Sequence, residues 1–257
     1  MKYIDTHCHL AGPYYKDNVI EDIKHAQKEG VNYIIMPGTT AKDSQESIAL
    51  AKNHPGVFAC AGIHPADASD PKALTHLDEV NPSDIIAVGE VGIDLYRASN
   101  PPLALQEKVF RHHIEYALKH DKPIIIHMRA CESELYNIIK DYPKARFVMH
   151  SFTSTWQWAS KFIKLGGYIS FSGIVTFKNA KELQEVVKKM PLDRIIYETD
   201  APFLTPMPHR GKHNKPEYVK HVAHQIATLR DEKQEQVLKT LFNNALKLFK
   251  IKGGTYE

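Results

Sequence analysis

Two histidines separated by a single residue are the first chemically suggestive feature of the chain. His7 and His9 follow the short strand-like segment Tyr3-Ile4-Asp5. Successive side chains of a strand point to opposite faces, so the two imidazoles must project together, and Cys8 must point the other way. Neutral imidazole is a common ligand for zinc and similar ions. Taken alone, such a pair more often means two surface histidines at the end of a strand.

Further candidate ligands follow other short apolar segments. They are His64, Glu90, His127, His150 and Asp200. In a barrel of parallel strands the chemistry lies at the carboxyl ends of the strands, so we expect these side chains to meet at one rim. One such residue is usually a helix cap or a loop hydrogen bond. Several at the same end of successive strands predict a site for two divalent cations, with imidazole and oxygen ligands and open positions for water and substrate.

The two carboxylates have different predicted roles. Glu90 comes from the middle of the ring and carries two oxygens, so we expect it to bridge the two cations. Asp200 lies beside the first strand once the barrel closes, which predicts a terminal ligand and proton acceptor. Asp5 lies on the same face of the strand as His7 and His9 but one layer deeper in the barrel. Its predicted role is either to support the metal ligands from behind or to pack inside the barrel. Cys8 is predicted to be a small buried hydrophobe.

A group of cationic side chains accompanies these ligands. Arg129 stands two residues after His127, and a Pro/Gly-rich loop after the last strand contains His209, Arg210, Lys212 and His213. Charged residues in such loops are usually only solvated. A basic loop at this rim is also well placed to hold phosphate oxygens, and we predict phosphate contacts from Arg129, Arg210 and Lys212.

The elements that would position these residues alternate along the chain. After the first strand, strand-like runs lie at 32–36, 57–62, 85–89, 123–126, 146–149, 168–170 and 194–197, and helix-like amphipathic stretches at 19–29, 42–53, 103–120, 132–142, 155–165, 215–229 and 231–249. This alternation predicts a single (β/α)₈ TIM barrel domain over residues 1–257. The alternative is an open doubly wound sheet, which would require a Gly-rich phosphate turn after the first strand, and Gly12 alone does not make one.

Composition narrows the class of protein. Hydrophobic residues make up 43% of the chain and charged residues 25%, as in ordinary soluble globular proteins. A net charge of +3 does not by itself indicate nucleic-acid binding, so any basic patch must be local. The three widely spaced cysteines predict neither disulfides nor a thiolate zinc site. We see no signal peptide and no membrane anchor, which predicts a cytoplasmic protein, and no obligate protein partner is evident.

Several sequence blocks resemble the TatD family of metal-dependent deoxyribonucleases within the amidohydrolase superfamily. They span nearly the whole chain and are residues 4–10, 62–65, 88–94, 123–129, 171–178 and 198–204. The resemblance implies a TIM barrel, the metal ligands His7, His9, Glu90, His127, His150 and Asp200, and a substrate near His64 and Arg129. It also implies hydrolysis of DNA, often from the 3′ end. Two loops depart from the family pattern: Ser151-Phe152-Thr153-Ser154 replaces Cys-Phe-Ser-Gly, and His213 and Lys215 replace an Arg and a Glu.

The resulting hypothesis is a deoxyribonuclease, with 3′-to-5′ exonuclease action on single-stranded DNA, in which two divalent cations bridged by Glu90 activate a hydroxide that attacks a phosphodiester. Four histidines suit Zn, Mn or Co better than Mg as the bound cation. The family resemblance nevertheless implies that Mg can support activity. One alternative is hydrolysis of another ester or amide, such as an aminoacyl-tRNA ester. A second is a catalytically silent nucleic-acid-binding barrel.

Overall fold

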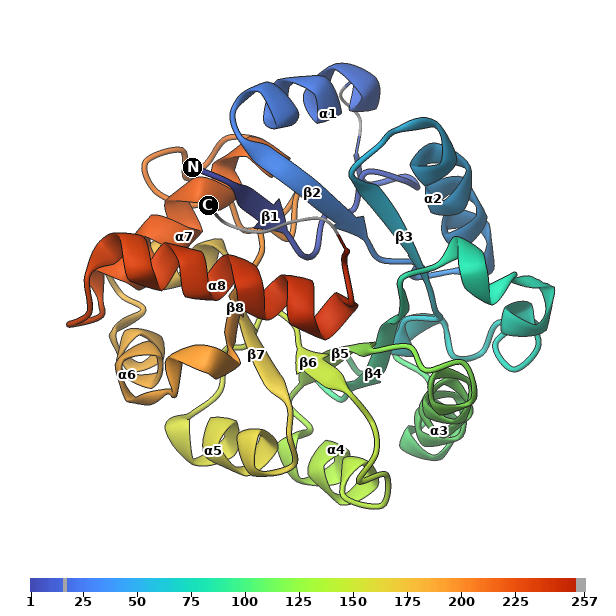
Figure 1. Cartoon of the computed structure of the whole chain (residues 1–257). Helices are drawn as coiled ribbons and strands as arrows, with labels where there is room; N and C mark the ends of the chain where they lie inside the picture. The colour runs from blue at the N-terminus through green and yellow to red at the C-terminus, as the bar shows by residue number, and fades with distance from the viewer. Residues whose placement is uncertain (16–17, 253–257) are drawn as a thin grey trace.

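The computed structural model describes residues 1–15 and 18–252 and contains one parallel sheet of eight strands in the order β1 to β8 (Figure 1). The strands are β1 Tyr3–Asp5, β2 Val31–Met36, β3 Val57–Ala61, β4 Ala87–Asp94, β5 Ile124–Arg129, β6 Phe147–Met149, β7 Tyr168–Phe171 and β8 Ile195–Tyr197. Each pairs in parallel with the next along the chain, from β1·β2 to β7·β8.

Backbone contacts between the first and last strands bring the two edges of the sheet together. A parallel bridge joins Cys8 to Ala201, just beyond β1 and β8. Next to it, Asp200 N donates to His7 O at 2.9 Å and His9 N donates to Ala201 O at 2.7 Å. The predicted (β/α)₈ barrel is therefore confirmed, and the open-sheet alternative is excluded.

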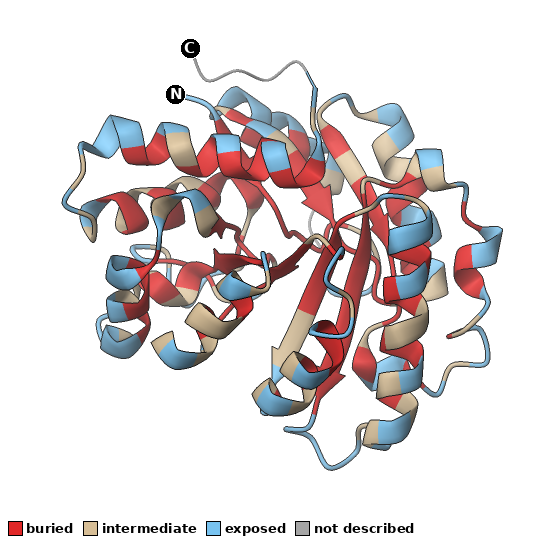
Figure 2. Ribbon diagram, turned by 60° about the horizontal axis from the view of Figure 1, so that its bottom comes forward, coloured by how far each residue is buried: buried red, intermediate tan, exposed pale blue. Residues whose placement is uncertain are grey.

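Helices surround the barrel, as Figure 1 shows. They are α1 Val19–Lys28, α2 Ala41–Asn53, α3 Leu103–Lys119, α4 Glu132–Ile139, α5 Trp156–Lys164, α6 Lys181–Lys189, α7 Val219–Thr228 and α8 Gln234–Phe249. Each helix has one buried face, which packs against the strands. The strands are therefore covered by the helices on the outside and by barrel side chains on the inside (Figure 2). In the described residues no helix is long and apolar enough to cross a membrane.

Two elements differ from the regular pattern. Residues 62–86 form the short 3₁₀ helices η1 Pro65–Asp67, η2 His76–Glu79 and η3 Pro82–Asp84 in place of an α-helix between β3 and β4. The prolines in this segment lack the N–H that a helix interior needs. Helix α6 was not among the predicted stretches, because it is only nine residues long and strongly charged, with Leu183, Val186 and Val187 as its buried side chains.

Strand β4 runs to Asp94, five residues beyond its predicted end at Gly89. It is buried throughout, and two of its glycines have backbone angles that suit glycine, with φ near +149° at both Gly89 and Gly92. A Cβ at Gly92 would lie 2.0 Å from His127 O on the neighbouring strand. Glycine therefore permits β4 and β5 to approach closely where the polar residues begin.

Candidate metal centre

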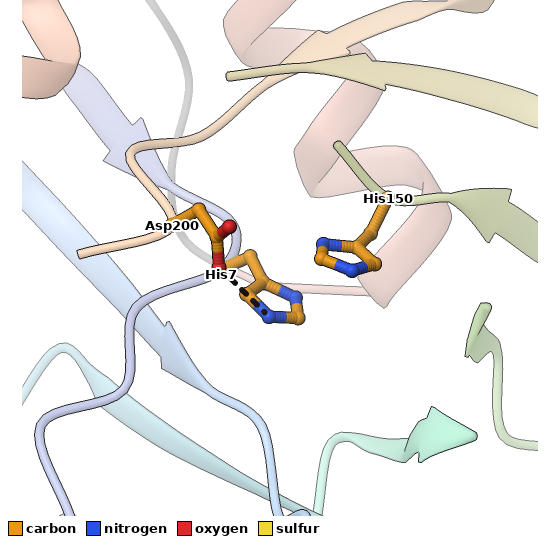
Figure 3. Close-up of side chains that lie close together, drawn as sticks. All are labelled: His7, His150 and Asp200. Carbon is orange, nitrogen blue, oxygen red and sulfur yellow. Dashed lines mark ion pairs between the residues drawn. The ribbon is translucent and has the colours of Figure 1, made fainter. Parts of the chain in front are cut away.

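The seam between β1 and β8 brings three predicted ligands together. His7 and His9 follow β1 and Asp200 follows β8; His9 and Asp200 line the pocket at the mouth of the barrel, and His7 is fully buried beside them. Asp200 adopts a positive φ of 58°, and its amide is bonded to His7 O. Figure 3 shows His7 and Asp200 in contact, with His150 beside them. The rings of His7 and His150 are stacked, with centroids 4.0 Å apart.

Four atoms form the first donor group: the Nε2 atoms of His7 and His9, Glu90 Oε2 and Asp200 Oδ1. Five of the six distances among them lie between 3.1 and 3.7 Å. In a triangle with such edges, as formed by the donor atoms of His7, His9 and Glu90, the centre lies about 2 Å from each corner, close to the bond lengths of zinc with imidazole nitrogen and carboxylate oxygen. Because two imidazole nitrogens and two carboxylate oxygens converge at this spacing, the residues fit a divalent cation.

The other oxygen of Glu90 faces a second donor group. Glu90 Oε1 lies 2.8 Å from His127 Nδ1, 2.9 Å from His150 Nε2 and 3.6 Å from His64 Nε2. The carboxylate thus presents one oxygen to each group, which is the geometry that a bridging ligand requires. His64, Glu90 and His127 also lie close enough together to hold an ion.

An irregularity in β4 aims Glu90 at the centre. The pairing of β4 with β5 shifts register between Val88 and Val91, and Glu90 lies in this bulge. The bulge is held by the loop after β2, because Glu90 N donates to Gly38 O at 2.7 Å and Gly38 N donates to Gly89 O at 2.9 Å. Bulges commonly redirect a side chain beside a functional site, and here the redirected side chain is the shared carboxylate.

Electrostatic coupling within the cluster is strong. Burial alone raises the pKa of Glu90, but its contacts with His150, His127 and His7 outweigh burial and bring this pKa well below its usual range. For His150 the order is reversed: burial lowers its pKa, and the Glu90 and Glu198 carboxylates raise it well above the ordinary value. The cluster therefore favours ionised carboxylates next to imidazoles, the donor types of a cation site.

His64 differs from His127 and His150 because one of its ring nitrogens accepts a hydrogen bond from the backbone, whereas theirs contact supporting carboxylates. Its Nδ1 accepts from Ala66 N at 3.1 Å. Burial lowers the pKa of His64 to about 3, so its ring is neutral near pH 7 and its hydrogen is on Nε2, the atom that faces Glu90. A nitrogen that carries hydrogen donates and has no lone pair for a metal. The structure therefore favours His64 as a hydrogen-bond donor at the centre.

Outer carboxylates hold the ligands in place. Glu198 is 1% exposed and accepts from His150 Nδ1 at 3.1 Å, from Ser151 N at 2.7 Å and from Ser170 Oγ at 2.6 Å. Asp94 accepts from His127 Nε2 at 3.3 Å. Neither residue was identified as a site residue from sequence. Asp94 lies in the block 88–94, four residues after Glu90, and Glu198 lies in the block 198–204, two residues before Asp200.

Asp5 combines the two roles that the sequence left open. Its carboxylate accepts from His7 N at 3.3 Å and from Thr199 N at 2.9 Å, and it bonds the Thr199 hydroxyl. Complete burial raises the pKa of Asp5 to about 8, although these hydrogen bonds oppose the rise. The residue therefore packs inside the barrel and also fixes the backbone of β1 and β8 behind the donor groups. Cys8 is fully buried, as predicted.

The donor groups form the floor of a pocket of about 590 Å³. His9, His64, Glu90, His127, His150, Asp200 and Arg129 all line it. The guanidinium of Arg129 lies 3.9 Å from the ring centroid of Tyr96. The charge of Arg129 helps to lower the pKa of Asp94, and its side chain lines the pocket wall.

The basic loop after β8 lies elsewhere. Arg210 and Lys212 are not among the residues that line the pocket. Arg210 stacks on Phe177, with its guanidinium 4.2 Å from the ring centroid, and the Lys212 carbonyl accepts from the Thr205 hydroxyl. Phosphate contact by these two residues stays a prediction. Sequence reasoning also missed pocket residues that follow β1, β4, β7 and β8: Tyr14, Arg97, Asn100, Ile174, Phe203 and Leu204.

Comparison with known proteins identifies relatives over the whole length. The family model described as TatD related DNase matches residues 4–250. The metal-dependent hydrolase YabD of Bacillus subtilis is 38% identical and covers 96% of this chain and 98% of its own length. YcfH of Escherichia coli, also named a metal-dependent hydrolase, is 34% identical over 98% of this chain and 97% of its own. The crystal structure of YjjV, a TatD homologue from Escherichia coli, superposes with a TM-score of 0.87 at 31% identity, covering 97% of this chain and 98% of that one.

Proposed function

Because the chain belongs to the TatD-related DNase family and is a metal-dependent hydrolase, we propose that it hydrolyses the phosphodiester bonds of DNA, acting from the 3′ end of single strands. The observation that carries this proposal is the shared carboxylate: Glu90 presents one oxygen to His7 and His9 and the other to His127 and His150. Such an arrangement suits the two-metal chemistry by which many enzymes cleave phosphodiesters.

Six residues would hold two divalent cations: His7, His9, Glu90, His127, His150 and Asp200. When bound, such cations lower the pKa of water and neutralise charge on phosphate oxygens. Imidazole-rich donors suit Zn, Mn or Co, and the activity with Mg that the family resemblance implies also belongs to the proposal. The distances between the donor atoms support these six residues as ligands. Activity measured with each added metal distinguishes between the ions.

The protein's own residues position the substrate and move the proton. Asp200 takes the proton from the attacking water, because its carboxylate is ionised and lies at the pocket floor. His64 donates its Nε2 hydrogen to a phosphoryl oxygen, since its Nδ1 is engaged by Ala66 N. Arg129 adds a second, charged donor from the wall of the pocket. Together they orient the phosphodiester and balance the charge that develops on it.

The test uses 3′-labelled and 5′-labelled single-stranded oligodeoxynucleotides with added Mg, Mn, Zn or Co. We expect turnover with at least one metal and loss of label from the 3′ end first. Glu90→Gln and Asp200→Asn should lower turnover by at least about a hundredfold, as is typical when an electrostatic or acid–base group is lost. Both variants should keep the circular dichroism spectrum of the wild type.

Three outcomes would overturn the proposal. If both variants turned over the substrate as fast as the wild type, Glu90 and Asp200 would not belong to the catalytic site. Hydrolysis of an aminoacyl ester or an amide in the absence of DNA cleavage would assign the same centre to another reaction. Tight DNA binding without turnover under any metal would indicate a binding protein that has kept the barrel.

A further inference from the structure

The two walls of the pocket above the donor groups differ in chemistry. One wall comes from the segments after β7, β8 and β1, which are neighbours in the barrel, and it carries Ile174, Phe203, Leu204 and Tyr14. The opposite wall comes from the segments after β4 and β5 and carries Arg97, Asn100 and Arg129. A ligand whose phosphate lies at the floor therefore meets rings on one side and cationic or amide groups on the other.

Two aromatic side chains form the most exposed part of the apolar wall. Tyr14 is 52% exposed and Phe203 is 44% exposed, although both are large enough to favour burial. Their ring centroids lie 5.6 Å apart in an edge-to-face arrangement, and Phe203 makes a similar contact with His9, at 6.1 Å. The pair thus begins at the donor groups and continues outward to solvent. Exposed aromatic surface next to a reactive centre marks a binding surface.

Backbone hydrogen bonds fix the position of Phe203 relative to the donor groups. Phe203 N donates to Asp200 O at 2.8 Å, and the Asn214 amide group bonds the Phe203 carbonyl. A group that stacks on this ring is therefore placed at a fixed distance from the Asp200 carboxylate. Because the Phe203 ring lies beside the His9 ring, a base stacked on Phe203 lies next to the donor groups.

We infer that Tyr14 and Phe203 form a stacking platform for one unpaired nucleobase of the nucleotide whose phosphate lies at the donor groups. This inference rests on the proposed function and specifies its substrate: a nucleotide with an unstacked base, and not a sugar phosphate or another phosphoester. Every base has a π-face, so the platform is tolerant of sequence. A base inside a duplex cannot reach the platform, so the platform predicts a preference for single strands and ends.

The test compares two ligands that differ only in the base: 2′-deoxyadenosine 5′-monophosphate and 2-deoxyribose 5-phosphate. Each is titrated calorimetrically into the Zn²⁺-loaded protein, so the readout does not depend on hydrolysis. The wild type should bind the nucleotide about tenfold more tightly, the order expected for one base stacked on an aromatic ring. In Tyr14→Ala this advantage should fall severalfold, and in Tyr14→Phe, which keeps the ring, it should return.

A second readout and a matched control sharpen the comparison. The nucleotide with 2-aminopurine as its base should lose fluorescence on binding to the wild type and to Tyr14→Phe, and lose less on binding to Tyr14→Ala. Leu118→Ala removes another exposed apolar side chain, 37% exposed on α3 away from the pocket, and should leave both readouts at the wild-type level.

The inference is overturned if the two ligands bind the wild type equally, if neither binds, or if Tyr14→Ala keeps the full advantage of the base. The outcome is separable from the proposed reaction. Base-dependent binding by a protein that cleaves no DNA would reject the reaction and keep the platform. Cleavage of DNA with no contribution from the base would keep the reaction and reject the platform.

Discussion

Removing the carboxylate of Glu198 should weaken metal binding without touching any of the donor atoms. Glu198 is buried behind His150 and accepts three hydrogen bonds, from His150 Nδ1, Ser151 N and Ser170 Oγ. The bond from Nδ1 holds a hydrogen of His150 on that nitrogen, so Nε2, which faces Glu90, is the nitrogen that would bind a cation once its own proton is lost. Glu198 is therefore a positioning residue for the donor group.

The structure gives different magnitudes for two substitutions. In Glu198→Ala the His150 N–H, the Ser151 N–H and the Ser170 hydroxyl lose their acceptor, and each unsatisfied buried donor costs about 1–3 kcal/mol, so unfolding should become easier by about 3–9 kcal/mol. In Glu198→Gln the amide oxygen still accepts from the two N–H groups and the amide NH₂ can face the Ser170 hydroxyl. The stability should then change little, but the negative charge is lost and metal affinity should fall by about tenfold to a hundredfold.

Two measurements separate these effects. Metal affinity is determined near pH 7 by competition between the protein and a chromophoric chelator for Zn²⁺, and stability by urea unfolding of the metal-free protein. Glu185→Gln is the matched control, because it neutralises a carboxylate that is 54% exposed on α6. If Glu198→Gln bound Zn²⁺ as tightly as this control, the role of Glu198 in orienting His150 would be refuted.

Three further predictions follow from single residues. Arg129→Ala should raise KM for oligodeoxynucleotides by about tenfold, the cost of one charge-assisted hydrogen bond, and leave Zn²⁺ affinity unchanged. Burial lowers the pKa of His76 to about 4 and that of His113 to about 3, so the unfolded chain takes up protons first as the pH falls below 6.5. Urea unfolding should show a loss of about 1.4 kcal/mol per pH unit for each of them, and His113→Gln should make this decline shallower. Gly92→Ala should lower the melting temperature much more than Gly166→Ala, because a Cβ at Gly92 would collide with the carbonyl of a β5 residue whereas a Cβ at Gly166 would meet no atom within 4 Å; equal losses would contradict this.

Much of the barrel could be read from the sequence because its strands are short, apolar and regularly spaced. The period-two geometry of a strand already placed His7 and His9 on one face, and the parallel topology placed the other strand-end residues at the same rim. The structure brings His7, His9, Glu90, His127, His150 and Asp200 together at that rim. Local pattern sufficed here because each donor is fixed by its own strand.

Tertiary structure decided what local pattern could not. Asp94 on β4 meets His127 on the neighbouring β5, and Glu198 after β8 meets His150 after β6, so each support is far from its histidine in sequence and nothing in its own neighbourhood marks it. The basic loop with Arg210 follows the last strand in sequence, yet it packs on Phe177 outside the pocket, because proximity along a long loop does not fix its direction. Tyr14 and Phe203 come from opposite ends of the chain and meet only when β1 closes against β8. The chain determined where each donor stands on its strand, and closure of the barrel determined which side chains surround it.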